Sequence, residues 1–144
     1  MAITNRTRQW GMAWLFLALA IALHVSDEAL TDFLPLYNSI VESWRDSYPW
    51  LPLPTFSFSV WLTGLLLGVL VLLGLSPLVF RGDAWLRPVS YALGILMMAN
   101  ALGHIGASLY WGMLAPGVLS SPILLLAALA TLSESGFFEI NQGS

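Results

Sequence analysis

Four long apolar runs dominate the pattern of hydrophobic and polar positions along the chain. They cover residues 10–30, 58–80, 88–113 and 118–133, to within a residue or two at each end. A helix that crosses a bilayer needs roughly 20 predominantly apolar residues, and the first three runs reach that length. The pattern therefore predicts an all-α membrane protein, a four-transmembrane-helix bundle that forms a single domain over residues 1–144.

The hydrophilic connection between the first two runs, residues 31–56, has a pattern of its own. Its apolar residues recur at intervals of three and four with polar residues between them, as at Phe33, Leu34, Tyr37, Ile40, Val41 and Trp44. This spacing predicts an amphipathic helix that is too polar to span and lies on the membrane surface. Pro35 fits such a helix only in its first turn or at a kink.

Two of the apolar runs contain polar residues that hydrophobicity alone does not explain. His24, Asp27 and Glu28 share one helical face near the end of the first run, because they are spaced i, i+3 and i+4. Asn100 and His104 form a second pair, one turn apart, in the third run. An Asp at the centre of a spanning helix costs roughly 2.5–3.5 kcal/mol, so a functional site facing the bundle interior is the expected reason for its presence.

The two polar groups are predicted to lie at the same depth. With a rise of about 1.5 Å per residue, His24 lies roughly 21 Å and Glu28 roughly 27 Å beyond Trp10. On the third run, counted from Pro88, Asn100 lies roughly 18 Å and His104 roughly 24 Å along the helix. Both runs cross the membrane in the same direction, so the pairs should meet in one half of the bundle, with the amphipathic helix over them.

Composition narrows the class of protein. Hydrophobic residues make up 58% of the chain and charged residues only 9%, against about 25% charged in soluble proteins. A net charge of −3 without a basic cluster excludes nucleic acid as a partner. The absence of cysteine excludes disulfides, thiolate metal sites and cysteine nucleophiles. Membrane lipids are the expected partners, with a homodimer as one oligomeric state left open.

The arginines predict the orientation. Four of them, Arg6, Arg8, Arg81 and Arg87, fall on one side of a four-span arrangement, and Arg45 falls on the other. The positive-inside rule then places both termini in the cytoplasm and residues 31–56 outside, in what we expect is a bacterial cytoplasmic membrane. The alternative for the first run is a secretory signal peptide cleaved after Ala22.

Small residues suggest where helices approach closely. Gly64 and Gly68 form a GxxxG pair, which lets another helix come near but also arises by chance in leucine-rich spans. Ala99, Gly103 and Ala107 repeat every four residues beside the polar pair of the third run. We expect this seam to bring the first and third spans together.

The ordered combination of these motifs resembles a known family. His24-x-x-Asp27-Glu28, Asn100-x-x-x-His104 and Pro116-Gly117 are similar to the motifs of small membrane proteins named for an HxxEE sequence. Asp27 departs from the family name, which expects Glu there, and keeps the charge with a shorter reach. The resemblance implies a site and no particular chemistry. A further similarity is to sterol-isomerase-like four-span proteins, which also place His and Glu one turn apart.

Three functions fit these residues. In a metal-dependent membrane enzyme, His24, Glu28 and His104 would bind one divalent ion, zinc or iron. Asp27 and Glu28 would be the catalytic residues, with Asp27 either a general base or a residue that supports a metal ligand. Asn100 and Trp111 would bind a lipid or isoprenoid-like substrate. A metal-free acid–base hydrolase or isomerase would use the same groups. A lipid-binding or proton-coupled carrier would need only the polar cavity, and interhelical hydrogen bonds, worth about 0.6 kcal/mol each, are the structural alternative.

Overall fold

The computed structural model describes residues 5–136, and all regular structure in that range is helical. The five helices are α1 (Asn5–Leu30), α2 (Phe33–Ser47), α3 (Phe58–Arg81), α4 (Leu86–Trp111) and α5 (Ser121–Glu134). The all-α prediction is confirmed. The end of the polar tail, including Glu139 and Gly143-Ser144, lies outside the described residues.

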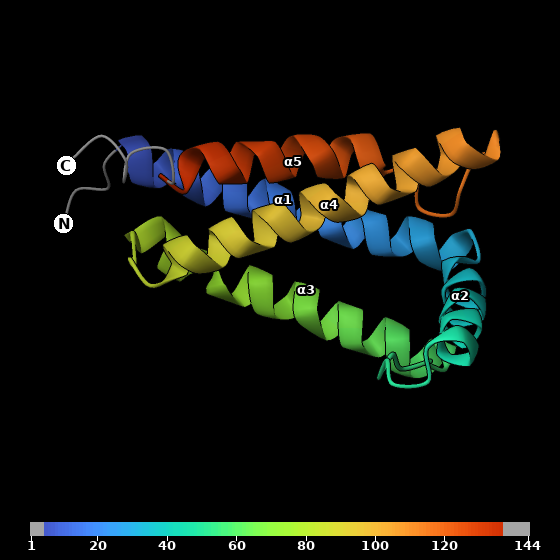
Figure 1. Cartoon of the computed structure of the whole chain (residues 1–144). Helices are drawn as coiled ribbons and strands as arrows, with labels where there is room; N and C mark the ends of the chain where they lie inside the picture. The colour runs from blue at the N-terminus through green and yellow to red at the C-terminus, as the bar shows by residue number, and fades with distance from the viewer. Residues whose placement is uncertain (1–4, 137–144) are drawn as a thin grey trace, which may run out of the picture.

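Four of the helices run lengthwise and the fifth crosses one end (Figure 1). Successive long helices alternate in direction, and the α3–α4 reversal is made at Gly82, whose φ of +87° suits glycine. The short helix α2 lies across the end of the bundle where α1 finishes and α3 begins (Figure 1). One end of the bundle therefore holds the α3–α4 turn beside the start of α1 and the end of α5, and the other end holds α2 and the α4–α5 loop (Figure 1).

Helix α1 is the central element of the packing. The main contacts between long helices are those of α4 with α5, α1 with α3 and α1 with α5. One buried cluster joins α1, α4 and α5, and its members are Leu17, Ala20, Ala101, Leu124, Ala127 and Ala128. A second cluster joins α1, α3 and α4 at the opposite end, with Trp10, Trp14, Val79 and Leu86.

The small-residue seam of α4 does not pack against α1, so that expectation is wrong. Ala99, Gly103 and Ala107 line a cavity, and a Cβ added at Gly103 would meet no atom within 4 Å. The close approach of α4 is made instead to α5 through Gly94, where an added Cβ would lie 2.8 Å from Leu132. The side chain of Leu132 on α5 packs against that glycine, so this face of α4 is turned toward α5.

Three helices are long and apolar enough to cross a membrane, namely α1, α3 and α4. Only 17% of the most apolar window of α3 and of α4 is buried within the chain, so most of their apolar side chains face outward. An outward apolar surface is the arrangement expected of helices that contact lipid tails. The apolar helix α5 has 14 residues and falls short of the length of a full span.

The expected amphipathic helix is present as α2, with Pro35 in its first turn as the sequence requires. Its apolar residues Leu34 and Val41 are buried, whereas Glu42 and Arg45 are exposed. Two hydrogen bonds join Asn38 to the backbone of Phe56, at 2.9 and 3.1 Å, and so hold the following extended segment against α2. This segment returns the chain to α3 without a further helix.

The last helix begins three residues later than predicted. Residues 118–120 form a turn, and α5 starts at Ser121. Gly117 has a φ of +79°, and the amide of Val118 donates to Ala115 O at 3.1 Å, so the chain still turns where a helix was expected. Consequently the 112–120 loop, not a helix, faces the end of α1.

Candidate metal centre

Helix α1 directs two ligand-type side chains into the bundle near its C-terminal end. His24 and Glu28 are only 3% and 5% exposed, and their i, i+4 spacing places them on one face. His24 Nε2 lies 3.4 Å from Glu28 Oε1, and this nitrogen has no hydrogen-bond partner among residues 5–136. The regular helix thus brings an imidazole and a carboxylate together by spacing alone.

Helix α4 adds the third side chain. His104 is 8% exposed, and its Nε2 lies 3.0 Å from Glu28 Oε1. The imidazole rings of His24 and His104 are edge to face, with centroids 4.9 Å apart. The structure brings these three side chains together from two helices, whereas Asn100 lines an apolar cavity that Glu28 does not reach.

The three side chains form a group that could hold a metal ion. One ligand atom from each residue lies within 4.8 Å of the others. Ligands at 2.0–2.2 Å from a tetrahedral zinc ion are separated from one another by about 3.3–3.6 Å. The distances from Glu28 Oε1 to the two imidazole nitrogens, 3.0 and 3.4 Å, are close to that separation.

The 112–120 loop closes the site from the side of α5. The amide of Gly117 donates to Thr31 Oγ1 at 3.1 Å, and the amide of Ser120 donates to Asp27 Oδ2 at 2.8 Å. A Cβ on Gly117 would lie 2.9 Å from His104 and 3.1 Å from Glu28. Only glycine allows the backbone to pass this close to both ligand side chains.

The sequence analysis missed Ser120. Its hydroxyl lies 2.8 Å from His24 Nδ1 and 2.7 Å from Asp27 Oδ2, and the residue is 4% exposed. Ser120 lies just before the Ser-Pro start of α5, and a serine that precedes a helix start usually caps it. That signal marks the position as a helix boundary but does not point to a histidine in another helix.

Asp27 is half-buried and is directed toward Ser120 rather than into the cavities next to the site. One of its oxygens, Oδ2, accepts hydrogen bonds from both the amide and the hydroxyl of Ser120. Neither of the two cavities described below has Asp27 in its wall. The sequence left two roles open for Asp27, a general base or a residue that supports a metal ligand. This placement favours the support of a ligand.

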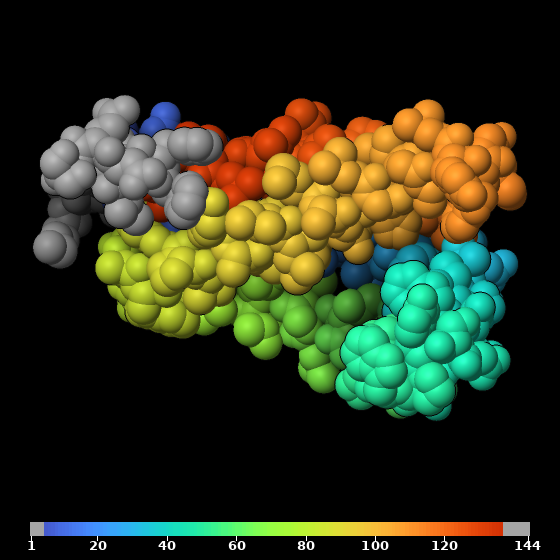
Figure 2. All heavy atoms as spheres, in the orientation of Figure 1, coloured from blue at the N-terminus to red at the C-terminus, as the bar shows by residue number. Residues whose placement is uncertain are grey.

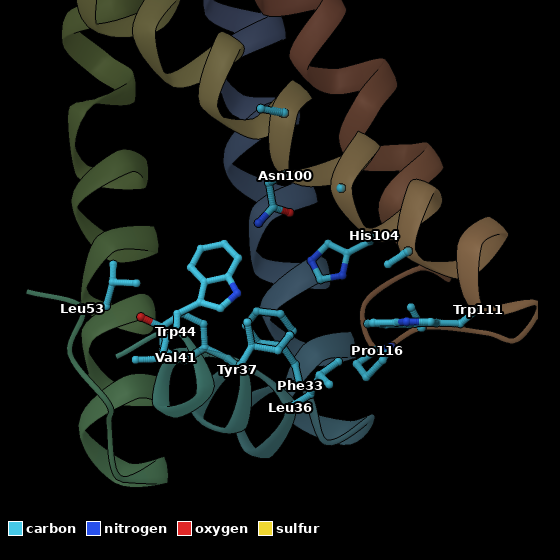
Figure 3. Close-up of a pocket in the computed structure, with 15 residues that line it drawn as sticks. Phe33, Leu36, Tyr37, Val41, Trp44, Leu53, Asn100, His104, Trp111 and Pro116 are labelled. Carbon is cyan, nitrogen blue, oxygen red and sulfur yellow. The ribbon is translucent and has the colours of Figure 1, made fainter. Parts of the chain in front are cut away.

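A cavity of about 410 Å³ opens beside His104 between α2 and α4 (Figure 3). Its walls are almost wholly apolar and aromatic, and its labelled lining residues are Phe33, Leu36, Tyr37, Val41, Trp44, Leu53, Asn100, His104, Trp111 and Pro116. Asn100 and Trp111, the predicted substrate-binding residues, are both in this wall. The buried Oδ1 atom of Asn100 has no hydrogen-bond partner, and Trp111 is 44% exposed at the rim.

A second cavity, of about 380 Å³, lies on the other side of Phe33. Glu28, Asn38 and Trp61 are among its lining residues. The Phe33 ring contacts both His104 and Trp61, at centroid distances of 5.3 and 6.2 Å. Phe33 therefore separates two cavities, one of which reaches His104 and the other Glu28. The space-filling view shows the molecule hollowed between α2 and α4, where α1 is visible below (Figure 2).

Comparison with known proteins gives one match. No curated protein and no solved structure matches the chain. A family described as "Protein of unknown function with HXXEE motif" matches residues 14–131. This range contains the motif at His24–Glu28, the His104 region and most of α5, and it covers well over half of the chain. The chain belongs to the HXXEE family.

Proposed function

We propose that this protein is an integral membrane enzyme that depends on one divalent metal ion bound by His24, Glu28 and His104. The observation that carries the proposal is the meeting of three buried ligand side chains, in which Glu28 Oε1 lies 3.0 and 3.4 Å from the two imidazole nitrogens and one ligand atom of each residue lies within 4.8 Å of the others. Two imidazoles and one carboxylate leave a coordination position free, as in catalytic zinc sites and in non-haem iron sites. A divalent ion there would supply Lewis-acid chemistry or activate a water molecule.

The substrate class follows from the cavity next to His104. A cavity of about 410 Å³ with aromatic and aliphatic walls suits the chain of a lipid or an isoprenoid-like compound. Asn100 is one turn from His104 in the same wall, and its unpartnered Oδ1 would accept a hydrogen bond from a polar group of the substrate. Trp111, at the rim, would contact the apolar part.

The membrane arrangement that goes with this function has four spans and α2 at the outer surface. Arg6, Arg8, Arg81 and Arg87 belong to the bundle end remote from α2, and Arg45 belongs to α2 itself (Figure 1). The positive-inside rule then puts both termini in the cytoplasm and α2 over the outer half, where it would control access to the cavity. Helix α5 would complete the fourth span together with the 112–120 loop, in which the amides of Gly117 and Ser120 are hydrogen-bonded to α1 and its end.

Cysteine labelling tests this arrangement without background, because the chain has no cysteine. In intact cells an Asp46→Cys variant should react with a membrane-impermeant thiol reagent, and an Asp83→Cys variant should not. The reverse pattern would overturn the orientation. Labelling of neither or of both would contradict the four-span arrangement.

Metal analysis of protein purified without a histidine tag tests the function. The wild-type chain should retain about one zinc or iron ion after dialysis, and the His24→Ala and His104→Ala variants should retain none while remaining folded. Tyr110→Ala is the control, because Tyr110 is 86% exposed on the same helix as His104. Wild-type protein without stoichiometric metal, or equal retention by the histidine variants, would contradict the proposal.

A metal-free protein is the second candidate. It is favoured by the 3.0 Å contact between His104 and Glu28, which pairs these groups directly without an ion. In that case the pair would exchange protons with a lipid-like substrate, or the cavity would bind a lipid as a carrier. Purified protein that lacks metal but retains a lipid would favour this candidate.

A further inference from the structure

A chain of hydrogen bonds runs from the half-buried Asp27 through Ser120 to the buried His24. Asp27 Oδ2 and Ser120 Oγ are 2.7 Å apart, and Ser120 Oγ and His24 Nδ1 are 2.8 Å apart. The three residues come from α1 and from the turn before α5, which are 93 or more positions apart in the sequence. Their meeting is therefore a product of the fold.

The direction of each hydrogen bond follows from counting protons. The Ser120 hydroxyl has one hydrogen, and its acceptors are Asp27 Oδ2 at 2.7 Å and Gly117 O at 3.2 Å. Asp27 Oδ2 is nearer and already accepts a hydrogen bond from the Ser120 amide at 2.8 Å, so it is the acceptor of this hydrogen. If His24 Nδ1 took it instead, two oxygens 2.7 Å apart would face each other without a proton. His24 Nδ1 must therefore carry a hydrogen and donate it to Ser120 Oγ.

This assignment determines the other nitrogen of His24. In the neutral imidazole, a hydrogen on Nδ1 leaves Nε2 with a lone pair. That nitrogen is buried, has no hydrogen-bond partner and lies 3.4 Å from Glu28 Oε1. Two electron-rich atoms then face each other in a buried space, which is unfavourable unless a metal ion or a proton lies between them.

We propose that Ser120 and Asp27 are positioning residues that hold His24 in the tautomer whose Nε2 binds the ion. The inference rests on the proposed metal site and deepens it. Metal-binding histidines usually donate their second ring N–H to a carboxylate or a similar acceptor, which fixes the ring and makes it a better donor to the metal. Here Ser120 transmits the effect of the Asp27 carboxylate. Asp27 thus acts on the metal through His24 and does not contact the substrate.

The same turn supplies a matched control. Ser121 follows Ser120, is fully buried, and its hydroxyl donates to Gly117 O at 2.8 Å without reaching a histidine. Ser120→Ala and Ser121→Ala therefore each remove one buried hydroxyl from the start of α5. Only Ser120→Ala breaks the connection to His24. Ser120→Thr keeps the hydroxyl and is the conservative variant.

The first measurement is the nitrogen NMR spectrum of His24 in metal-free protein, assigned with the His24→Gln variant. Wild type, Ser121→Ala and Ser120→Thr should show a protonated Nδ1 and an unprotonated Nε2, and Ser120→Ala should lose this preference. A wild-type His24 that carries its hydrogen on Nε2 would overturn the inference. This result does not depend on whether a metal binds, so it is separate from the test of the proposed function.

The second measurement is zinc affinity by competition with a chelating dye. Loss of such a supporting residue lowers metal affinity by about 10–100-fold, so Ser120→Ala should bind zinc that much more weakly than Ser121→Ala. Equal affinities of the two variants would contradict the inference. If Ser120→Ala does not fold, the NMR spectrum of the wild type decides alone. If the wild type binds no zinc, the proposed function fails, and the NMR result still tests the assignment of the tautomer.

Discussion

The two ends of the bundle are built on the same helix, α1, and use opposite kinds of packing. At the end remote from α2, Trp10 and Trp14 are fully buried with Val79 and Leu86. Trp10 Nε1 donates to Ser90 Oγ at 3.0 Å, so the polar atom of this large side chain is satisfied. At the end near α2, the Phe33 ring and the 112–120 loop lie against two histidines and a glutamate, and cavities of about 410 and 380 Å³ remain open.

The two ends differ in what their buried residues contribute to the protein. Large aromatic side chains exclude water and voids at one end, and the buried apolar area there stabilises the fold. The other end keeps polar groups within the apolar bundle, which costs free energy unless those groups bind something. Such unsatisfied atoms, here His24 Nε2 and Asn100 Oδ1, are expected where a ligand binds.

The largest expected effect on stability belongs to the tryptophan end. Trp14→Ala removes a side chain that is 1% exposed and donates to Leu72 O at 2.9 Å, and it should lower the free energy of unfolding by about 3–5 kcal/mol. Trp111→Ala is the control, because Trp111 is 44% exposed and should cost much less. Denaturation of both variants in detergent measures the difference. Equal losses would mean that the two ends do not differ in packing.

Gly117→Ala should disturb the proposed metal site at the α2 end, as Trp14→Ala should disturb the packing at the opposite end. The added Cβ would lie 2.9 Å from His104 and 3.1 Å from Glu28, so the ligands must move and zinc affinity should fall at least about tenfold. Gly112→Ala imposes a similar cost of about 1–2 kcal/mol for a left-handed backbone, since its φ is +64°, but meets no atom within 4 Å. Zinc titration of the two variants compares them. Unchanged affinity in Gly117→Ala would remove the loop from the site.

The sequence predicted the ligand group because regular helices have a fixed rise and turn. His24 and Glu28 lie one turn apart, and depth counting placed His104 level with them, so no knowledge of the loops was needed. The role of Ser120 could not be predicted, because it depends on a non-helical turn after Gly117 whose path is set by contacts with α1. The position of the α4 small-residue seam was mispredicted for a related reason. The spacing of small residues identifies a helix face that another helix can approach, but not which helix does so. Only the fold shows that Leu132 of α5 packs against Gly94.

Phe33→Ala should have a smaller effect at the α2 end, on the rate at which zinc dissociates. Removal of the ring joins the two cavities and uncovers His104, so zinc should dissociate several-fold faster while the overall fold remains. Phe58→Ala is matched to it, because the Phe58 ring also contacts Trp61, whereas the aromatic rings that contact His104 among the described residues are those of His24 and Phe33. Stopped-flow zinc release to a chelator measures the rates. Identical rates would show that Phe33 does not cover the site.

The smallest effect is expected at the GxxxG pair of α3. Gly64→Ala and Gly68→Ala add methyl groups that meet no atom within 4 Å, so together they should change the free energy of unfolding by no more than about 0.5 kcal/mol. Gly94→Ala is the contrasting variant, because its Cβ would lie 2.8 Å from Leu132 and should destabilise the fold by about 1–3 kcal/mol. A destabilisation at Gly64 and Gly68 that depends on protein concentration would instead indicate a homodimer through this face.

X-ray absorption of zinc-loaded protein tests the central claim most directly, since it reports the atoms bound to the ion. In the wild-type protein we expect one zinc ion with two imidazole nitrogens and at least one oxygen at about 2.0–2.2 Å. The His104→Ala variant should lose the ion or one imidazole contribution. A wild-type spectrum with no imidazole scattering, or one that His104→Ala leaves unchanged, would contradict a metal centre made of His24, Glu28 and His104.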